Sequence, residues 1–219
     1  MLSGSEIVKA MKTQRLWETL SDSARKVMVI DGKSLKPHPR IAIKPFNDLQ
    51  LNPNSYNLRL SNKLLIYTGD ELDMAKDNPT EEIQIPPEGL VLEPGQLYLG
   101  ATIEHTETYN LVPFIEGRSS VARLGLSIHL TAGFGESNFQ GTWTLEMTVV
   151  HPLRVYAGVE LCQIGYSPLV GNSTDYKGKY QGQTGPKSSQ LWEEFQPRVH
   201  EVLGGAVGDP SKLAEADFR

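Results

Sequence analysis

Two glutamates, Glu136 and Glu146, stand ten residues apart in the stretch TAGFGESNFQGTWTLEM at 131–147. We expect a glycine-rich turn to lead here into a strand, and side chains alternate between the two faces of a strand. One face then carries Thr142, Thr144, Glu146 and Thr148, and the other carries Trp143, Leu145, Met147 and Val149. A carboxylate on such a polar face can serve as a general base and then as a general acid. The alternative is an ordinary strand glutamate that faces solvent or an ion-pair partner.

An anion-binding group precedes this strand in the stretch EGRSSVARLGL. Arg118, Ser119 and Ser120 follow a glycine and offer a guanidinium fork with two hydroxyl groups. Such groups, together with backbone N–H groups, hold phosphate oxygens through charge-assisted hydrogen bonds. Arg123 points back toward the same site if residues 121–126 form a short helix or turn. The alternative is a polar loop with ordinary surface arginines.

The N-terminus predicts a helix over residues 3–17, because Ser3 and Glu6 have the spacing of a capping box. The apolar stripe of this helix would consist of Ile7, Val8, Ala10, Met11 and Leu16. The following stretch, at about 21–40, has a weak pattern that ends in the breaker KPHPR. It indicates an insertion or a short hairpin.

From residue 41 to residue 168 the sequence consists of short stretches rich in strand formers, each bounded by glycine, proline or asparagine. Pro94 and Gly95 fit the centre of a type II turn. Many closely spaced strands are typical of an antiparallel barrel or jelly roll, so we expect a mainly β fold. The stretch after residue 170 has almost no aliphatic side chains, which indicates a linker or an ordered loop that covers something.

The composition restricts the class of protein. The 219 residues include 21 basic and 26 acidic side chains, a net charge of −5, which argues against a nucleic-acid partner held by phosphate neutralisation. The single cysteine, Cys162, excludes a disulfide framework and a cysteine-rich zinc site within one chain. No apolar run approaches membrane-spanning length, and the N-terminus lacks the apolar core of a signal peptide. We therefore expect no membrane partner and a cytoplasmic location.

The pattern GRSSVARLGL…H.TAG…F.G…LE resembles the dCTP deaminase and dUTPase superfamily, and the glutamate in TLE is similar to its deaminase branch. Three further blocks, LNPNSYNLRLSNKLLIY, LEPGQLYLGATIE and GKYQGQTGPKSS, match the family in the same order. The resemblance covers about residues 41–195 and the first helix. It implies a distorted β-barrel of the dUTPase type that forms a homotrimer with sites shared between subunits. The chain would then be one domain over 1–196, with a C-terminal lid at 172–190 and a tail at 197–219.

The resemblance also implies catalytic and base-recognition roles for particular residues. Glu146 would activate the water that attacks C4 of cytosine, with Arg123 beside the base and this water. The backbone around Thr131 and Ala132 would read the edge of the pyrimidine. His129 matches a family histidine whose role is either structural or part of the site.

The nucleotide's phosphates would have their own partners. Arg118, Ser119 and Ser120 would contact the triphosphate, and Tyr176, Lys179 and Gln183 would belong to the lid that closes over it. Mg²⁺ would accompany the triphosphate, bound mainly by phosphate oxygens and water rather than by protein side chains. The zinc route to deamination needs H-x-E and P-C-x-x-C motifs, which this sequence lacks, so no zinc is expected.

Two positions depart from the family pattern. Glu136 stands where the family has an aspartate that holds the sugar 3′-hydroxyl and, in dUTP-cleaving members, helps to position the hydrolytic water. Asn57 stands where many members have aspartate. Because one extra methylene moves a carboxylate by more than about 1 Å, Glu136 argues against a diphosphatase step.

The main hypothesis from the sequence is therefore a zinc-independent dCTP deaminase that makes dUTP and ammonia for dTTP precursor synthesis. The alternative is a bifunctional deaminase and diphosphatase that forms dUMP and pyrophosphate. A plain dUTPase is disfavoured, since that branch has no need of Glu146. An alternative of another class is a catalytically weak nucleotide-binding regulatory protein that uses the extra segments to bind a partner. Feedback inhibition by dTTP is a further expectation from the resemblance.

Overall fold

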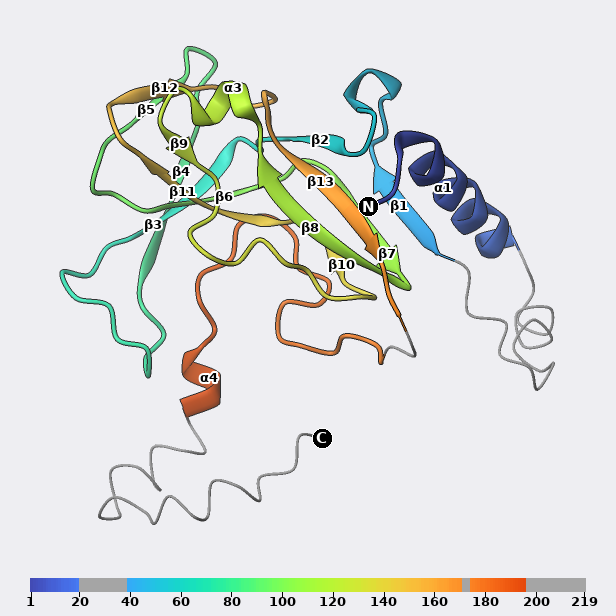
Figure 1. Ribbon diagram of the computed structural model, residues 1–219. Helices are drawn as coiled ribbons and strands as arrows, with labels where there is room; N and C mark the ends of the chain where they lie inside the picture. Colours follow the sequence, from blue (N-terminus) through green and yellow to red (C-terminus); the bar gives the residue numbers. More distant parts are fainter. Residues whose placement is uncertain (20–38, 171–173, 196–219) are drawn as a thin grey trace. The chain divides into compact units, whose positions relative to one another are not determined.

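The computed structural model describes residues 1–19, 39–170 and 174–195 (Figure 1). Most of the stretch at about 21–40, for which an insertion or hairpin was expected, and the whole tail at 197–219 lie outside the described residues. The chain divides into two compact units as far as it is described. The larger unit comprises Met1–Ile66 and Glu81–Lys187, and the smaller one comprises Tyr67–Thr80 and the chain from Ser188 onward.

Most of the described elements are short strands. The helices are α1 (Gly4–Thr19), the 3₁₀ helix η1 (Asp48–Gln50), α3 (Ser119–Ala122) and α4 (Trp192–Phe195). The strands are β1 (Arg40–Lys44), β2 (Tyr56–Arg59), β3 (Lys63–Tyr67), β4 (Thr80–Gln84), β5 (Leu90–Leu92), β6 (Tyr98–Ala101), β7 (His105–Tyr109), β8 (Leu111–Gly117), β9 (Leu126–Ser127), β10 (Gln140–Gly141), β11 (Thr144–Val149), β12 (Leu153–Val155) and β13 (Glu160–Pro168).

The strands pair in four small sheets. Their orders are β1-β7-β10, β4-β3-β6-β11-β9, β12-β5 and β2-β13-β8. The pairings between β11 and its neighbours β6 and β9, and between β13 and its neighbours β2 and β8, are all antiparallel. The expectation of a mainly β fold with antiparallel strand pairing is confirmed.

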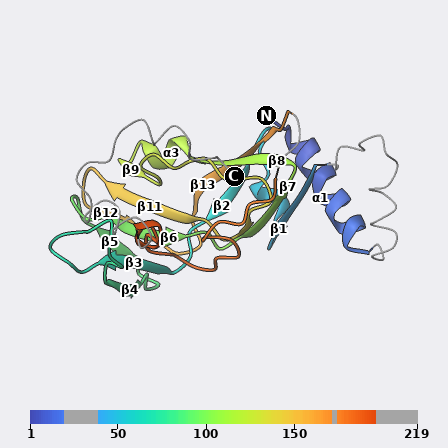
Figure 2. The same ribbon diagram turned by 90° about the horizontal axis from the view of Figure 1, so that it is seen from below.

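Helix α1 begins at the predicted cap. The backbone N–H of Glu6 donates to the Ser3 hydroxyl at 3.3 Å, as a capping box requires. The helix lies beside β1 in both ribbon views (Figures 1 and 2). The prediction for Leu16 was wrong: this side chain is 63% exposed, and Gln14 occupies the buried face together with Ile7 and Met11. Tertiary packing, rather than hydrophobicity alone, therefore determines which side chains of α1 face the core.

The turn predicted at Pro94 and Gly95 is also present. The N–H of Gln96 donates to the carbonyl of Glu93 at 3.4 Å, and Gly95 has a φ of +85°. A positive φ at the third residue is the mark of a type II turn, and glycine adopts it without strain.

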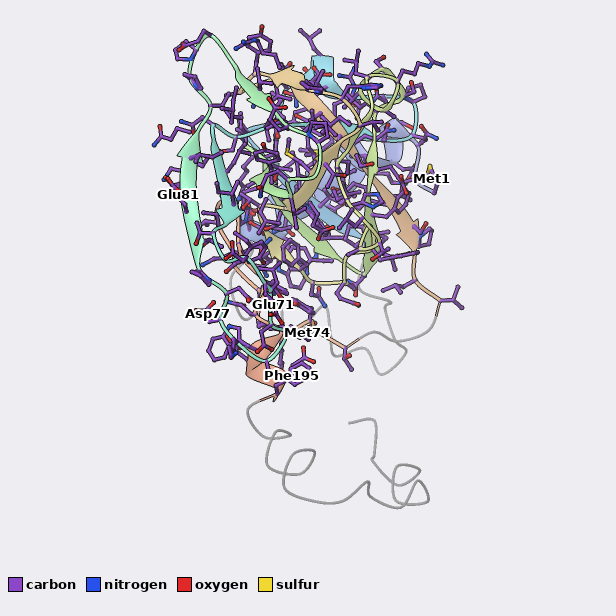
Figure 3. The ribbon with its side chains drawn as sticks, turned by 90° about the vertical axis from the view of Figure 1, so that its left-hand side faces the viewer. Met1, Glu71, Met74, Asp77, Glu81 and Phe195 are labelled. Atoms are coloured by element: carbon purple, nitrogen blue, oxygen red, sulfur yellow. The ribbon has the colours of Figure 1, made fainter. Side chains whose placement is uncertain are left out.

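The smaller unit contains the loop between β3 and β4, whose residues Glu71, Met74 and Asp77 are labelled in Figure 3. The Asp73 carboxylate accepts a hydrogen bond from the Ala75 N–H at 2.9 Å and pairs with Lys76 Nζ at 2.8 Å. These contacts hold the pKa of Asp73 below its usual range. The loop is therefore ordered by its own short-range polar contacts.

The larger unit buries one charged group that the sequence did not reveal. Glu104 is fully buried and accepts hydrogen bonds from Arg59 Nε at 2.6 Å, from the Arg59 backbone N–H at 2.8 Å and from Gln50 Nε2 at 3.0 Å. A buried carboxylate is costly unless such donors compensate it. The network therefore joins η1, β2 and the turn after β6.

Glu104→Gln should destabilise the protein by about 3 kcal/mol, because the exchange leaves the Arg59 guanidinium without its anionic partner. Urea denaturation measures this change. The matched control is Glu82→Gln, whose partner Lys63 is 48% exposed and whose loss should cost less than about 1 kcal/mol. Equal, small effects of the two exchanges would contradict the structural role of Glu104.

Cys162 offers a single-site probe of the core. Its side chain is fully buried on β13, and burial raises the pKa of its thiol. Native protein should therefore react slowly with a thiol reagent, and urea should make the reaction fast, because the thiolate is the reactive form. Rapid stoichiometric labelling of the native protein would show that β13 is not packed as described.

Candidate active site

Glu146 lies on β11, between β6 and β9. Within β11, Leu145, Met147 and Val149 are buried, whereas Thr144, Glu146 and Thr148 are partly exposed, as alternation predicts. The prediction was wrong for Thr142, which is buried, and for Trp143, which is partly exposed, because the strand begins only at Thr144. Glu146 Oε2 accepts a hydrogen bond from the backbone N–H of Leu130 at 3.2 Å. This bond brings the carboxylate to the turn that continues into Thr131 and Ala132, both of which are exposed. The expected catalytic acid and the backbone expected to read the pyrimidine are thus adjacent.

The expected phosphate contacts lie where β8 passes into α3 (Figure 1). The helix begins at Ser119, earlier than the stretch 121–126 in which a helix or turn was expected, and Arg118 is its N-cap residue. Ser119 and Ser120 are exposed in its only turn. Arg123 ends the helix with an exposed side chain, and its N–H donates to the Ser119 carbonyl at 3.1 Å. The four side chains therefore lie on one short helical turn.

Arg118 has a partner that the sequence analysis missed. Its Nη1 donates to the backbone carbonyl of Glu160 at 2.8 Å and lies 3.4 Å from the Glu160 carboxylate. Asn57, noted as a departure from the family, donates from Nδ2 to that same carboxylate at 2.6 Å. The departure from the family pattern at Asn57 was the signal in the sequence that this position has an unusual partner. Only the pairing of β2 with β13 shows that the partner of Asn57 is Glu160. Glu160 and Asn57 together fix the direction of the Arg118 side chain.

Glu136 lies away from the Arg118 group. The segment after β9 runs antiparallel beside β8, with Ile115 N–H donating to the Gly133 carbonyl at 2.8 Å and Gly135 N–H donating to the Pro113 carbonyl at 2.9 Å. Since Arg118 follows the end of β8, this register places Glu136 at the opposite end of the strand. The Glu136 side chain is exposed. The two groups therefore do not form a single cluster within one chain.

The described part of the expected lid, residues 174–190, attaches to the chain just before β11. Gln183 Nε2 donates to the carbonyl of Thr142 at 2.7 Å, and the N–H of Thr142 donates to the Gln183 carbonyl at 3.0 Å. The N–H of Lys187 donates to the Thr144 hydroxyl at 3.2 Å. Thr144 shares the face of β11 with Glu146, so the segment ends next to the candidate catalytic side chain.

Gln181 is a second residue that the sequence analysis missed. Its side chain accepts from the Gln140 N–H at 3.0 Å and donates to the Asn138 carbonyl at 2.8 Å. The stretch YQGQ forms a turn in which the Gln183 N–H donates to the Tyr180 carbonyl at 3.2 Å, and no local signal in the sequence indicated the contacts of Gln181. Gln181 and Gln183 therefore hold the segment along residues 138–144.

The other expected lid residues occupy the same segment. The Tyr176 ring lies 6.2 Å from the Phe139 ring, and its N–H donates to the Ser137 carbonyl at 3.3 Å. Lys179 is partly exposed, with Nζ 5.9 Å from the centre of the Tyr180 ring. Tyr176 is thus anchored next to the turn that carries Glu136.

The contacts of His129 bear on both roles considered for it, a structural one and one in the site. Its Nε2 lies 3.7 Å from the Glu116 carboxylate, which suits a structural ion pair when the ring is protonated. Its Nδ1 is buried without a hydrogen-bond partner. Buried polar atoms normally have partners, so the orphaned Nδ1 keeps the second role open.

No three His, Cys, Asp or Glu side chains gather as a candidate metal site in the described parts of the chain. The absence of zinc stays a prediction from the sequence. Among the same residues, no helix is long and apolar enough to cross a membrane.

Comparisons with known proteins identify the family of this chain. A protein of Hathewaya histolytica named "dCTP deaminase, dUMP-forming" is 55% identical over 172 residues, which cover 77% of this chain and 100% of the relative. A protein of the same name from Leptospira biflexa is 53% identical over 174 residues, covering 78% and 100%.

Two solved structures show weaker likeness. The 2′-deoxycytidine 5′-triphosphate deaminase of Agrobacterium tumefaciens superposes with a TM-score of 0.48 at 20% identity, covering 68% of this chain and 48% of the other. A dUTPase of Staphylococcus bacteriophage 80alpha has a TM-score of 0.40 at 12% identity, covering 62% and 94%. A family model described as dCTP deaminase-like matches residues 31–169. The chain belongs to this dCTP deaminase-like family.

Proposed function

We propose that this protein is a bifunctional enzyme that converts dCTP to dUMP, ammonia and pyrophosphate. The observation that carries the proposal is the identity of 53–55% to two proteins named dCTP deaminase, dUMP-forming, along their whole length. The main hypothesis from the sequence stopped at dUTP because of Glu136. The comparisons favour its alternative.

In the first reaction, the Glu146 carboxylate takes a proton from water while the water oxygen bonds to C4 of the cytosine. The carboxylic acid passes this proton to N3 of the ring. The carboxylate then takes the proton of the new C4 hydroxyl and delivers it to the amine, and the C4–N bond breaks as C4=O forms, so that ammonia departs and uracil remains. The Leu130 N–H donates to Oε2, and in this proposal Oε1 takes the proton from the water. Arg123 and the backbone at 131–132 supply the remaining contacts to the base and the water.

The triphosphate binds to Arg118, Ser119 and Ser120, and Lys179 and Gln183 close over it. Arg118 contacts Glu160 through Nη1, and a guanidinium has five N–H donors, so the side chain can hold Glu160 and a phosphate together. Mg²⁺ accompanies the nucleotide and neutralises phosphate charge. In this proposal phosphate oxygens and water, rather than protein side chains, would bind the ion.

The complete site forms between subunits of a homotrimer. Support comes from β8, whose opposite ends carry Arg118 and Glu136. Further support comes from the apolar side chains Leu124, Leu130, Phe134 and Val150, which are 60%, 58%, 83% and 68% exposed around α3 and the turn before Glu136. Exposed apolar groups of this kind mark protein–protein contacts. Inhibition by dTTP remains an expectation from the family resemblance.

Wild-type protein incubated with dCTP and magnesium should form dUMP without accumulating free dUTP, as resolved by ion exchange. Accumulation of dUTP without dUMP would support the deaminase alone. Tight nucleotide binding without turnover would support the regulatory alternative.

Glu146→Gln should lower the deamination rate by about 10²-fold to 10⁴-fold, because the amide cannot carry the proton, while dCTP binding stays largely intact. Turnover assays and equilibrium binding of dCTP measure the two effects. Glu82→Gln, an exposed strand glutamate on β4, is the control. Turnover near the wild-type rate in Glu146→Gln would overturn the mechanism.

Glu136→Gln should slow the cleavage of dUTP and leave dCTP deamination active, so that dUTP accumulates. Supplying dUTP as the substrate isolates this second step. Glu136→Asp should preserve or improve the activity if the position has the family role. A large loss in Glu136→Asp would show that the site is built around the longer side chain.

A further inference from the structure

The turn that carries Glu136 rests on Trp143. A side chain at Gly135 would place its Cβ within 2.8 Å of Trp143 Cζ3 and still closer to Cη2. Atoms cannot approach this closely, so the indole ring admits only glycine directly before Glu136. The ring thereby fixes how near the Gly135 backbone lies to β11.

Trp143 also touches the other end of the same turn. Its ring centre lies 4.7 Å from that of Phe139, and the Phe139 N–H donates to the Glu136 carbonyl at 3.2 Å. The indole therefore contacts the residue before Glu136 and the residue that closes the turn after it. The Phe139 ring in turn packs on Tyr176 of the C-terminal segment.

The indole is itself held in one orientation. Trp143 Nε1 donates to the hydroxyl of Thr106 at 2.8 Å, and Thr106 is fully buried on β7. The backbone N–H of Trp143 donates to the Thr102 hydroxyl at 3.0 Å. A large ring tied at both its nitrogen and its backbone is a rigid support for the turn.

We propose that Trp143 is a positioning residue for Glu136 and selectively supports the dUMP-forming step; this inference rests on the proposed function. In that step a water oxygen bonds to the α-phosphorus of dUTP, and the bond from this phosphorus to the oxygen bridging to the β-phosphorus breaks. The water proton passes to solvent, and dUMP and pyrophosphate leave. Glu136 orients the nucleotide and the water. The described contacts of the Trp143 ring are with Gly135, Phe139 and Thr106, whereas the Glu146 carboxylate is held by the Leu130 N–H, so deamination depends on Trp143 less.

The first test is Trp143→Phe, which removes the outer indole atoms and the bond to Thr106. With dUTP as substrate, kcat should fall about tenfold or more with little change in KM, since small displacements cost large factors in rate. With dCTP, the ratio of dUTP to dUMP should rise. Trp17→Phe, the same exchange on α1, is the control and should leave the ratio unchanged.

The second test is a double-mutant cycle with Gly135→Ala. The added methyl group clashes with the indole and should also raise the dUTP to dUMP ratio, whereas Gly135→Ala combined with Trp143→Phe should recover part of the loss, because the shorter ring leaves space. Thermal melting verifies that each variant is folded. If Gly135→Ala alone fails to fold, the kcat with dUTP and the product ratio of Trp143→Phe test the proposal by themselves.

A wild-type product ratio in folded Trp143→Phe, or equal slowing of both reactions, would overturn the role of Trp143. These outcomes are distinct from a failure of the proposed function, which would appear as wild-type protein that forms no dUMP from either nucleotide.

Discussion

Strand alternation on β11 is the constraint on which the candidate site depends. Leu145 and Met147 are buried in the core, so the backbone of β11 has little freedom to shift or rotate. A slip of one residue would expose these side chains and bury Glu146 without a partner. The same packing that stabilises the sheet therefore holds the carboxylate of Glu146, the proposed catalytic group, toward Leu130 and the turn at 131–132.

Three other segments derive their positions from this strand. Residues 181–187 bind along 138–144 through the side chains and backbone of Gln181 and Gln183. The turn that carries Glu136 rests on Trp143, directly before β11. The end of β11 pairs with β9, which follows α3 and the residues proposed to bind phosphate. The segments proposed to contact the base, the sugar and the phosphates are thus all positioned by β11.

Local signals in the sequence predicted local features well. The cap at Ser3, the type II turn at Gly95 and the face of Glu146 each follow from spacing over a few residues. Features that join distant segments were not predictable in this way. The pairing of Arg59 with Glu104 spans 45 residues, and the contact of Arg118 with Glu160 spans 42. Both depend on sheet pairings, which no short pattern encodes. The prediction for Leu16 failed for the same reason, since it depended on contacts with distant segments. Hydrophobicity alone placed Leu16 on the apolar stripe, but the packing of α1 leaves this side chain exposed.

The family resemblance identified the family and suggested the site residues, but it left the second reaction open, because Glu136 differs from the expected aspartate. Trp143 supports the backbone of the turn from which this longer carboxylate projects.

Isotope labelling tests the central claim most directly. One turnover of dCTP in ¹⁸O water, followed by mass spectrometry of the product, reports where each water oxygen enters. The account predicts dUMP with one ¹⁸O atom at C4 of the uracil and one on the phosphate. Product in which the base carries the label and the triphosphate stays intact would contradict the dUMP-forming assignment, and an unlabelled base would contradict hydrolytic deamination itself.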